Sequence, residues 1–169
     1  MKEIFFGFVF LTLSFVNIFA QNKEARKFDE LESFYTCEDV RNRVDSFMSE
    51  LQNQPLARGY IIVYDGNYRF IKDTKYFFHL NALPESEKWK SNLPVIGETV
   101  FRSQQILKHI NARQFPKQRI LLISGGYRKH HAIEFWIVPS GIMLPKPSPT
   151  IQEIKYRKGK VEGIICEAA

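Results

Sequence analysis

Residues 118–139, QRILLISGGYRKHHAIEFWIVP, join two apolar segments through the polar sequence GGYRKHH. We expect RILLIS and AIEFWIV to be strands, because short runs rich in β-branched and aromatic residues, bounded by turn residues, are typical of strands. Gly125 and Gly126 are able to adopt the unusual backbone angles that a connection between two strands requires. Residues 128–131 would then be exposed near its tip, since loops run over the surface.

Two amphipathic helices are predicted upstream. In CEDVRNRVDSFMSELQ, apolar residues recur at steps of four, three, one and three, which places them on one helix face. These residues are Val40, Val44, Phe47, Met48 and Leu51. Thr36 offers a capping hydroxyl, and Glu38 and Asp39 lie in the first turn, where the helix dipole favours acids. The second helix, ETVFRSQQILKHINA, begins at Glu98 and is also amphipathic.

The remaining elements complete an α/β pattern. We expect a first short strand in KFDELES (27–33) and a buried strand in ARGYIIVYDG (57–66). Residues 67–97 mix aromatic and charged residues, and a structureless loop of that length is unusual in a compact domain, so we expect a short helix or hairpin there. The order strand, helix, strand, insertion, helix, strand, strand predicts a two-layer sandwich with amphipathic helices packed on a mixed β-sheet.

The first twenty residues, MKEIFFGFVFLTLSFVNIFA, combine a charged start, a short apolar run and a final Ala20. This pattern is typical of a secretory signal peptide cleaved after Ala20, and an uncleaved anchor is the alternative. We therefore expect an exported protein, periplasmic or secreted, with one domain over residues 21–139 and no transmembrane span after cleavage. Export permits a disulfide between Cys37 and Cys166, provided that the two sulfur atoms meet in bonding geometry.

The C-terminal part of the chain is predicted to extend beyond this domain. Pro145, Pro147 and Pro149 make residues 140–150 an extended linker, because each proline fixes its own backbone and disfavours helix at the residue before it. Residues 151–169 form a tail in which we expect a two-stranded hairpin around Lys158 and Gly159.

The net charge of +6 indicates anionic partners such as envelope glycans, phospholipid headgroups or acidic polymers. Solubility alone also explains such a charge. The tail sequence KYRKGK suits a nucleic-acid backbone, but export makes that partner improbable, so we expect no nucleic acid. A basic outer face of a hairpin is the simpler interpretation.

Two segments resemble OmpA-like domains. VDSFMSELQNQPLARGYIIVYDG (44–66) resembles the family's helix, nP.AR turn and buried strand, and FRSQQILKHINARQFPKQRILLISGGYR (101–128) resembles its second helix and following strand. The chain is also similar to short exported bacterial proteins of unknown function that share ARGYIIVY and GGYR. Positions on the family's pattern are Arg102, Ser103, Ile106, His109, Ile110, Arg119, Ile120 and Gly126.

The resemblance implies association with peptidoglycan, in which an acid and the helix arginine grip diaminopimelate. A guanidinium holds a carboxylate through two hydrogen bonds, and the acid holds the amine. Arg102 matches the arginine. The family's GHTD run is absent, and Asp65 in YDGN is the nearest acid. The alternative is that Asp65 caps a turn with Gly66 and that Arg102 lies on a solvated helix face.

The GGYRKHH sequence is a second candidate for ligand binding. Tyr127, Arg128 and Lys129 would join Arg102 or Lys108 to bind an anionic glycan or phosphate, and adjacent glycine amides are able to cradle an anion.

A metal site is not expected in GGYRKHH. His130 and His131 are neighbours on a strand and point to opposite faces, so they do not chelate one ion together. We predict neither a metal nor a cofactor for this chain.

Catalytic motifs are absent from the sequence, which contains no GxSxG, no HExxH and no phosphate-binding loop. We therefore predict a non-catalytic binding or scaffold protein of the cell envelope, with an envelope protein as a further candidate partner. The alternative is a hydrolase of an envelope polymer, with a site assembled from Asp65, Arg102, His109 and the residues 127–131.

Overall fold

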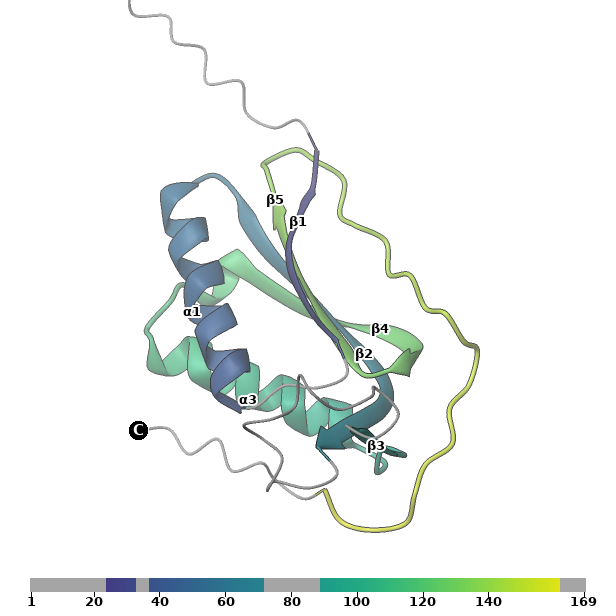
Figure 1. The fold of residues 1–169 in the computed structure, drawn as a ribbon. Helices are drawn as coiled ribbons and strands as arrows, with labels where there is room; N and C mark the ends of the chain where they lie inside the picture. The colour runs from purple at the N-terminus through teal and green to yellow at the C-terminus, as the bar shows by residue number, and fades with distance from the viewer. Residues whose placement is uncertain (1–23, 33–36, 72–88, 162–169) are drawn as a thin grey trace, which may run out of the picture.

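The structure, a computed structural model, describes residues 24–32, 37–71 and 89–161 (Figure 1). Its elements follow the predicted order of strands and helices. They are β1 (Arg26–Glu32), α1 (Cys37–Asn53), β2 (Arg58–Ile71), β3 (Trp89–Asn92), α3 (Glu98–Ala112), a short 3-10 helix (Lys117–Arg119), β4 (Ile120–His130) and β5 (Ala132–Val138). Both predicted helices are confirmed.

The sheet has β2 at its centre. β2 pairs in parallel with β4, where Gly59 faces Ile120, and antiparallel with β5, where Gly59 faces Ile137. β1 forms the edge beyond β5, and β3 pairs with the far end of β2 from Tyr68 onwards. Parallel neighbours need a long crossover, which here includes α3. The predicted mixed sheet with helices packed on it is confirmed.

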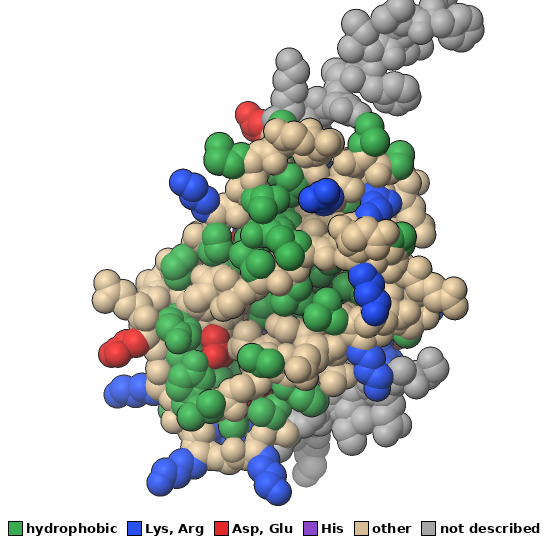
Figure 2. Space-filling view, turned by 180° about the vertical axis from the view of Figure 1, so that it is seen from behind, with side chains coloured by type: hydrophobic (Ala, Val, Ile, Leu, Met, Phe, Trp, Pro, Cys, Tyr) green, Lys and Arg blue, Asp and Glu red, His purple; other side chains and the backbone are tan. Residues whose placement is uncertain are grey.

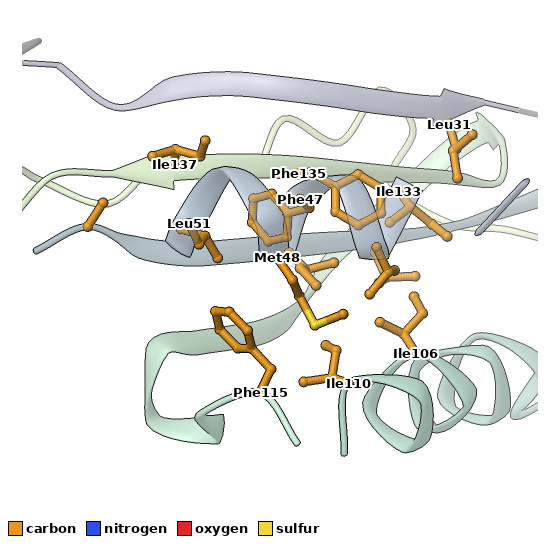
Figure 3. Packing of buried hydrophobic residues seen from close by; sticks show 14 residues of the cluster. Leu31, Phe47, Met48, Leu51, Ile106, Ile110, Phe115, Ile133, Phe135 and Ile137 are labelled. Atoms are coloured by element: carbon orange, nitrogen blue, oxygen red, sulfur yellow. The ribbon is translucent and has the colours of Figure 1, made fainter. Parts of the chain in front are cut away.

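The main core lies between the sheet and the two helices (Figure 3). The helix face predicted from the sequence contributes four buried side chains, Val44, Phe47, Met48 and Leu51, while Val40 packs at the margin. They meet side chains from α3, β5 and the loop after α3. These include Ile106, Ile110, Phe115, Ile133, Phe135 and Ile137.

A second apolar cluster lies on the outer face of the sheet. Tyr60, Ile62 and Tyr64 of β2 alternate with the core-facing residues of the same strand, as the period of two requires. Ile142, from the segment after β5, packs against this cluster. In Figure 1 that segment runs along the outside of the sheet towards β3 and α3. The predicted extended linker therefore covers part of the outer face.

The predicted connection GGYRKHH is wrong, because β4 continues through it to His130 and only His131 separates β4 from β5. β2 is long enough to pair with this stretch, and Asp65 faces Tyr127. At two register shifts in this pairing, β4 contains one residue more than the facing part of β2. Gly126 adopts a positive φ of 84° near the first shift. His131 is fully buried, so the predicted exposed tip is also wrong there.

Several predictions fall on residues that the structure does not describe. They concern the signal peptide, the cap at Thr36, Cys166 and most of the insertion, whose described ends pair as β2 and β3. The tail is described to Val161, so the hairpin expected around Lys158 stays a prediction. Within the described ranges, the helices are all too short or too polar to cross a membrane.

Candidate functional site

The outer face of the sheet carries a buried carboxylate at Glu134 on β5. Its side chain is 2% exposed, and its Oε1 accepts hydrogen bonds from Lys27 Nζ at 2.7 Å and from Arg128 Nη2 at 2.8 Å. Its Oε2 accepts from the hydroxyl of Tyr64 and from the indole N–H of Trp136, at 3.1 and 2.9 Å. Both carboxylate oxygens are therefore engaged by donors.

The charges around Glu134 decide its protonation state. Burial alone would raise the pKa of this carboxyl, but hydrogen bonds from Lys27, Trp136 and Arg128 outweigh that effect and lower the pKa to about 2. Glu134 is thus ionised throughout the physiological range. A buried charge with two cationic partners and two neutral donors is typical of a structural network.

Arg128 belongs to this network. Its guanidinium lies 3.6 Å from the ring centre of Tyr64 and also pairs with Glu30. Nε donates to the Ser148 carbonyl and Nη2 to the Ser148 hydroxyl, while the Ser148 N–H donates to the Tyr64 hydroxyl. Arg128, predicted to bind ligand, thus holds the segment after β5 on the outer face, whereas Lys129 beside it is exposed.

Arg102 lies near the start of α3 in a second cluster. Its Nη2 donates to Glu98 Oε1 at 2.8 Å, and its guanidinium lies 4.1 Å from the ring centre of Tyr68. The other Glu98 oxygen accepts the Val95 N–H, which fixes this carboxylate. The Arg102 side chain is only 14% exposed, so the interpretation of a solvated helix face is wrong.

Tyr68 connects Arg102 to the buried His131. The Tyr68 and His131 rings stack with their centres 4.6 Å apart. Burial, followed by the positive charge of Arg102, lowers the pKa of His131 well below its ordinary value. His131 is therefore a neutral part of the folded protein at physiological pH.

Asp65 lies in a third cluster, at the junction of β2 and β4. Its Oδ1 accepts the Gly66 N–H at 3.0 Å, but both residues lie within β2, so the predicted turn at Gly66 is wrong. Its Oδ2 accepts the hydroxyl of Tyr156 at 2.9 Å. Burial, and then hydrogen bonds to Asp65 and Tyr127, raise the pKa of Tyr156. The structure therefore brings Asp65 together with Tyr127 and with a tyrosine from the tail.

The Arg102 and Asp65 clusters are neighbours along β2. Asp65 and Tyr68 are three residues apart, which is roughly 10 Å in an extended strand. The hydrogen bonds of the described residues give Asp65 and Arg102 different partners. A ligand in contact with both would have to span two adjacent clusters.

His109 lies in a fourth group, between the helices. Its Nε2 is 2.8 Å from Asp45 Oδ1, and Arg113 donates two hydrogen bonds to the same carboxylate. Asp65, Arg102 and His109, three residues of the alternative hydrolase site, thus have separate partners. Across the part of the chain that the structure describes, no three His, Cys, Asp or Glu residues come together as a metal site.

Sequence reasoning missed Glu134 and Tyr156. The sequence does point to Glu134, because it is the single charged residue in the apolar strand AIEFWIV. No sequence pattern points to Tyr156, since its approach to Asp65 depends on the course of the tail.

Comparison of the chain with protein-family models, with curated proteins and with solved structures finds no match.

Proposed function

We propose that this chain is an exported, non-catalytic binding or scaffold protein of the cell envelope, with an OmpA-like fold, that associates with peptidoglycan or another anionic envelope polymer. The observation that carries the proposal is the setting of Arg102, whose guanidinium is stacked on Tyr68 and paired with Glu98. This residue matches the arginine on which the OmpA-like resemblance rests.

The stacked guanidinium suits a carboxylate ligand. Contact with the Tyr68 ring fixes the guanidinium plane, and the Glu98 carboxylate is bound along its edge. A guanidinium has five N–H donors in a rigid fork whose geometry matches a carboxylate. A ligand carboxylate would join Glu98 at Arg102 or replace it there.

Asp65 supplies the acid for a ligand that also carries an amine. It lies on β2, three residues before Tyr68, the residue on whose ring the Arg102 guanidinium is stacked. This arrangement supports a grip on diaminopimelate without the GHTD run of OmpA-like domains. The dispersed partners of Asp65, Arg102 and His109 give no support to the alternative hydrolase.

The charge of the surface also favours an anionic polymer. Lys and Arg side chains lie around the margin of the face seen in Figure 2, where acidic side chains are sparse. Exposed cations include Lys117, Lys129 and Lys155. Long-range attraction of this kind raises the local concentration of an anionic partner, and it weakens with salt.

Co-sedimentation of residues 21–169 with purified peptidoglycan at low and high salt tests the proposal. We expect a fraction of the binding to survive high salt, because the Arg102 contact is partly buried. Binding that disappears entirely at high salt would mean that only the basic surface attracts peptidoglycan. No binding at either salt concentration would exclude peptidoglycan as the partner.

A further inference from the structure

The C-terminal arm, defined as residues 150–157, crosses the end of the sheet where Asp65 lies. At one side, the N–H groups of Thr150 and Ile151 donate to the Tyr127 carbonyl at 2.9 and 3.3 Å. At the other, the Arg157 N–H donates to the Pro94 carbonyl at 2.9 Å. The arm is therefore anchored on β4 and on the loop that precedes α3.

Tyr156 lies between these anchors and directly beside the second one. The Arg157 side chain strengthens that anchor, because its Nε donates to the Leu93 carbonyl at 3.1 Å. The neighbouring Tyr156 hydroxyl then reaches Asp65 Oδ2 at 2.9 Å. The contact is thus positioned by backbone hydrogen bonds that do not involve Asp65.

The proposed function, on which this inference rests, requires Asp65 to accept a ligand amine. We propose that Tyr156 is an intramolecular competitor for this carboxylate, so that a ligand ammonium binds Asp65 by displacing the Tyr156 hydroxyl. Tyr156 is 36% exposed, and rotation of its side chain releases Asp65 while both anchors stay in place.

Competition of this kind selects for charged ligands. A neutral phenol donates one hydrogen bond to a carboxylate, whereas an ammonium adds its own charge to the hydrogen bond and forms the stronger contact. A neutral ligand gains little by displacing Tyr156. The arm would therefore restrict Asp65 to ligands that present an amine, as diaminopimelate does.

The test compares Tyr156→Phe with the unchanged mature chain in binding to soluble peptidoglycan fragments that carry diaminopimelate. Phenylalanine keeps the ring and removes only the hydroxyl. We expect binding to tighten about threefold to tenfold, the worth of a partly exposed hydrogen bond to a charged group. Tyr60→Phe, which removes a hydroxyl from the outer face of β2, serves as the matched control and should leave the affinity unchanged.

Two further experiments show whether the gain in affinity depends on Asp65. In an Asp65→Asn background, Tyr156→Phe should give no gain in affinity. Fragments whose amine is acetylated should bind Tyr156→Phe and the unchanged chain with equal affinity. Equal or weaker binding of Tyr156→Phe, in a protein whose unchanged form binds, would overturn the competitor role and leave the proposed function standing. Absence of binding in every form would overturn both.

Discussion

Lys27 and Glu134 are 107 residues apart in the sequence, and their side chains form an ion pair of 2.7 Å on the outer face of the sheet. They lie on β1 and β5, the first and last strands, which pair antiparallel. The same carboxylate binds Arg128, which holds Ser148 of the covering segment. One buried acid thus connects the two ends of the domain.

Removing the charge of Glu134 should destabilise the fold. In Glu134→Gln, Lys27 and Arg128 lose a buried counter-charge and keep only the partly exposed Glu30, and we expect the free energy of unfolding to fall by about 3 kcal/mol. Urea denaturation measures this change. Glu153→Gln, an exposed acid of the tail, is the matched control and should stay within about 0.5 kcal/mol. Equal effects of the two substitutions would contradict the central role of Glu134.

His131 should make the protein sensitive to mild acid. Its pKa is lowered in the folded state, so between that value and about 6.5 the unfolded chain binds a proton that the folded chain does not. The free energy of unfolding should therefore fall as pH drops below 6.5, by at most about 1.4 kcal/mol per pH unit from this group. Unfolding curves between pH 7 and pH 5 measure the slope, above the range in which Glu134 titrates.

The matched variant for this effect is His131→Phe, which keeps an aromatic ring against Tyr68. It should show a flatter dependence on pH over the same range, whatever its absolute stability. The same slope in both proteins would mean that another group causes the acid sensitivity.

Gly66 should not tolerate a side chain. A Cβ at this position would lie 2.3 Å from the His130 carbonyl carbon and 2.5 Å from the His131 nitrogen, both of them backbone atoms. We expect Gly66→Ala to lower the free energy of unfolding by about 3 kcal/mol, because the paired strands must separate. Thermal unfolding measures this change.

Gly141→Ala is the matched control for that substitution. Gly141 has a positive φ of 78° but nothing near its Cβ direction, so only backbone strain opposes the change, at about 1 kcal/mol. A cost at Gly66 no larger than at Gly141 would contradict the described approach of β2 to the end of β4.

The predicted bridge between Cys37 and Cys166 has a direct chemical test. Mature protein from an oxidising compartment should show no reactive thiol before reduction and two after it, as counted with a thiol reagent in denaturant. Two reactive thiols before reduction would remove the bridge.

The periodic parts of the fold could be predicted from the sequence. The spacing of Val44, Phe47 and Leu51 defined the buried helix face, and the continuous apolar run of β2 defined the central strand. GGYRKHH was misinterpreted because its glycines favour a turn locally, whereas pairing with the long β2 extends the strand through them. Local composition contains no information about the length of a distant partner strand.

The candidate site could be predicted only in part. Arg102 and Asp65 were identified from a resemblance and from local sequence, but the pairing of Asp65 with Tyr127 was not foreseen. Some of their partners come from segments remote in the chain, as when Tyr156 reaches Asp65 across 91 residues. Such contacts depend on how loops cross the sheet, which periodicity does not encode.

The measurement that tests the central claim most directly is co-sedimentation with peptidoglycan at high salt for Arg102→Ala and Arg113→Ala. Both substitutions remove one arginine from α3 or the residue that follows it, but Arg113 is 57% exposed and pairs with Asp45. The account predicts that Arg102→Ala abolishes the salt-resistant fraction and that Arg113→Ala retains it. Equal retention by both folded variants would contradict a specific grip at Arg102.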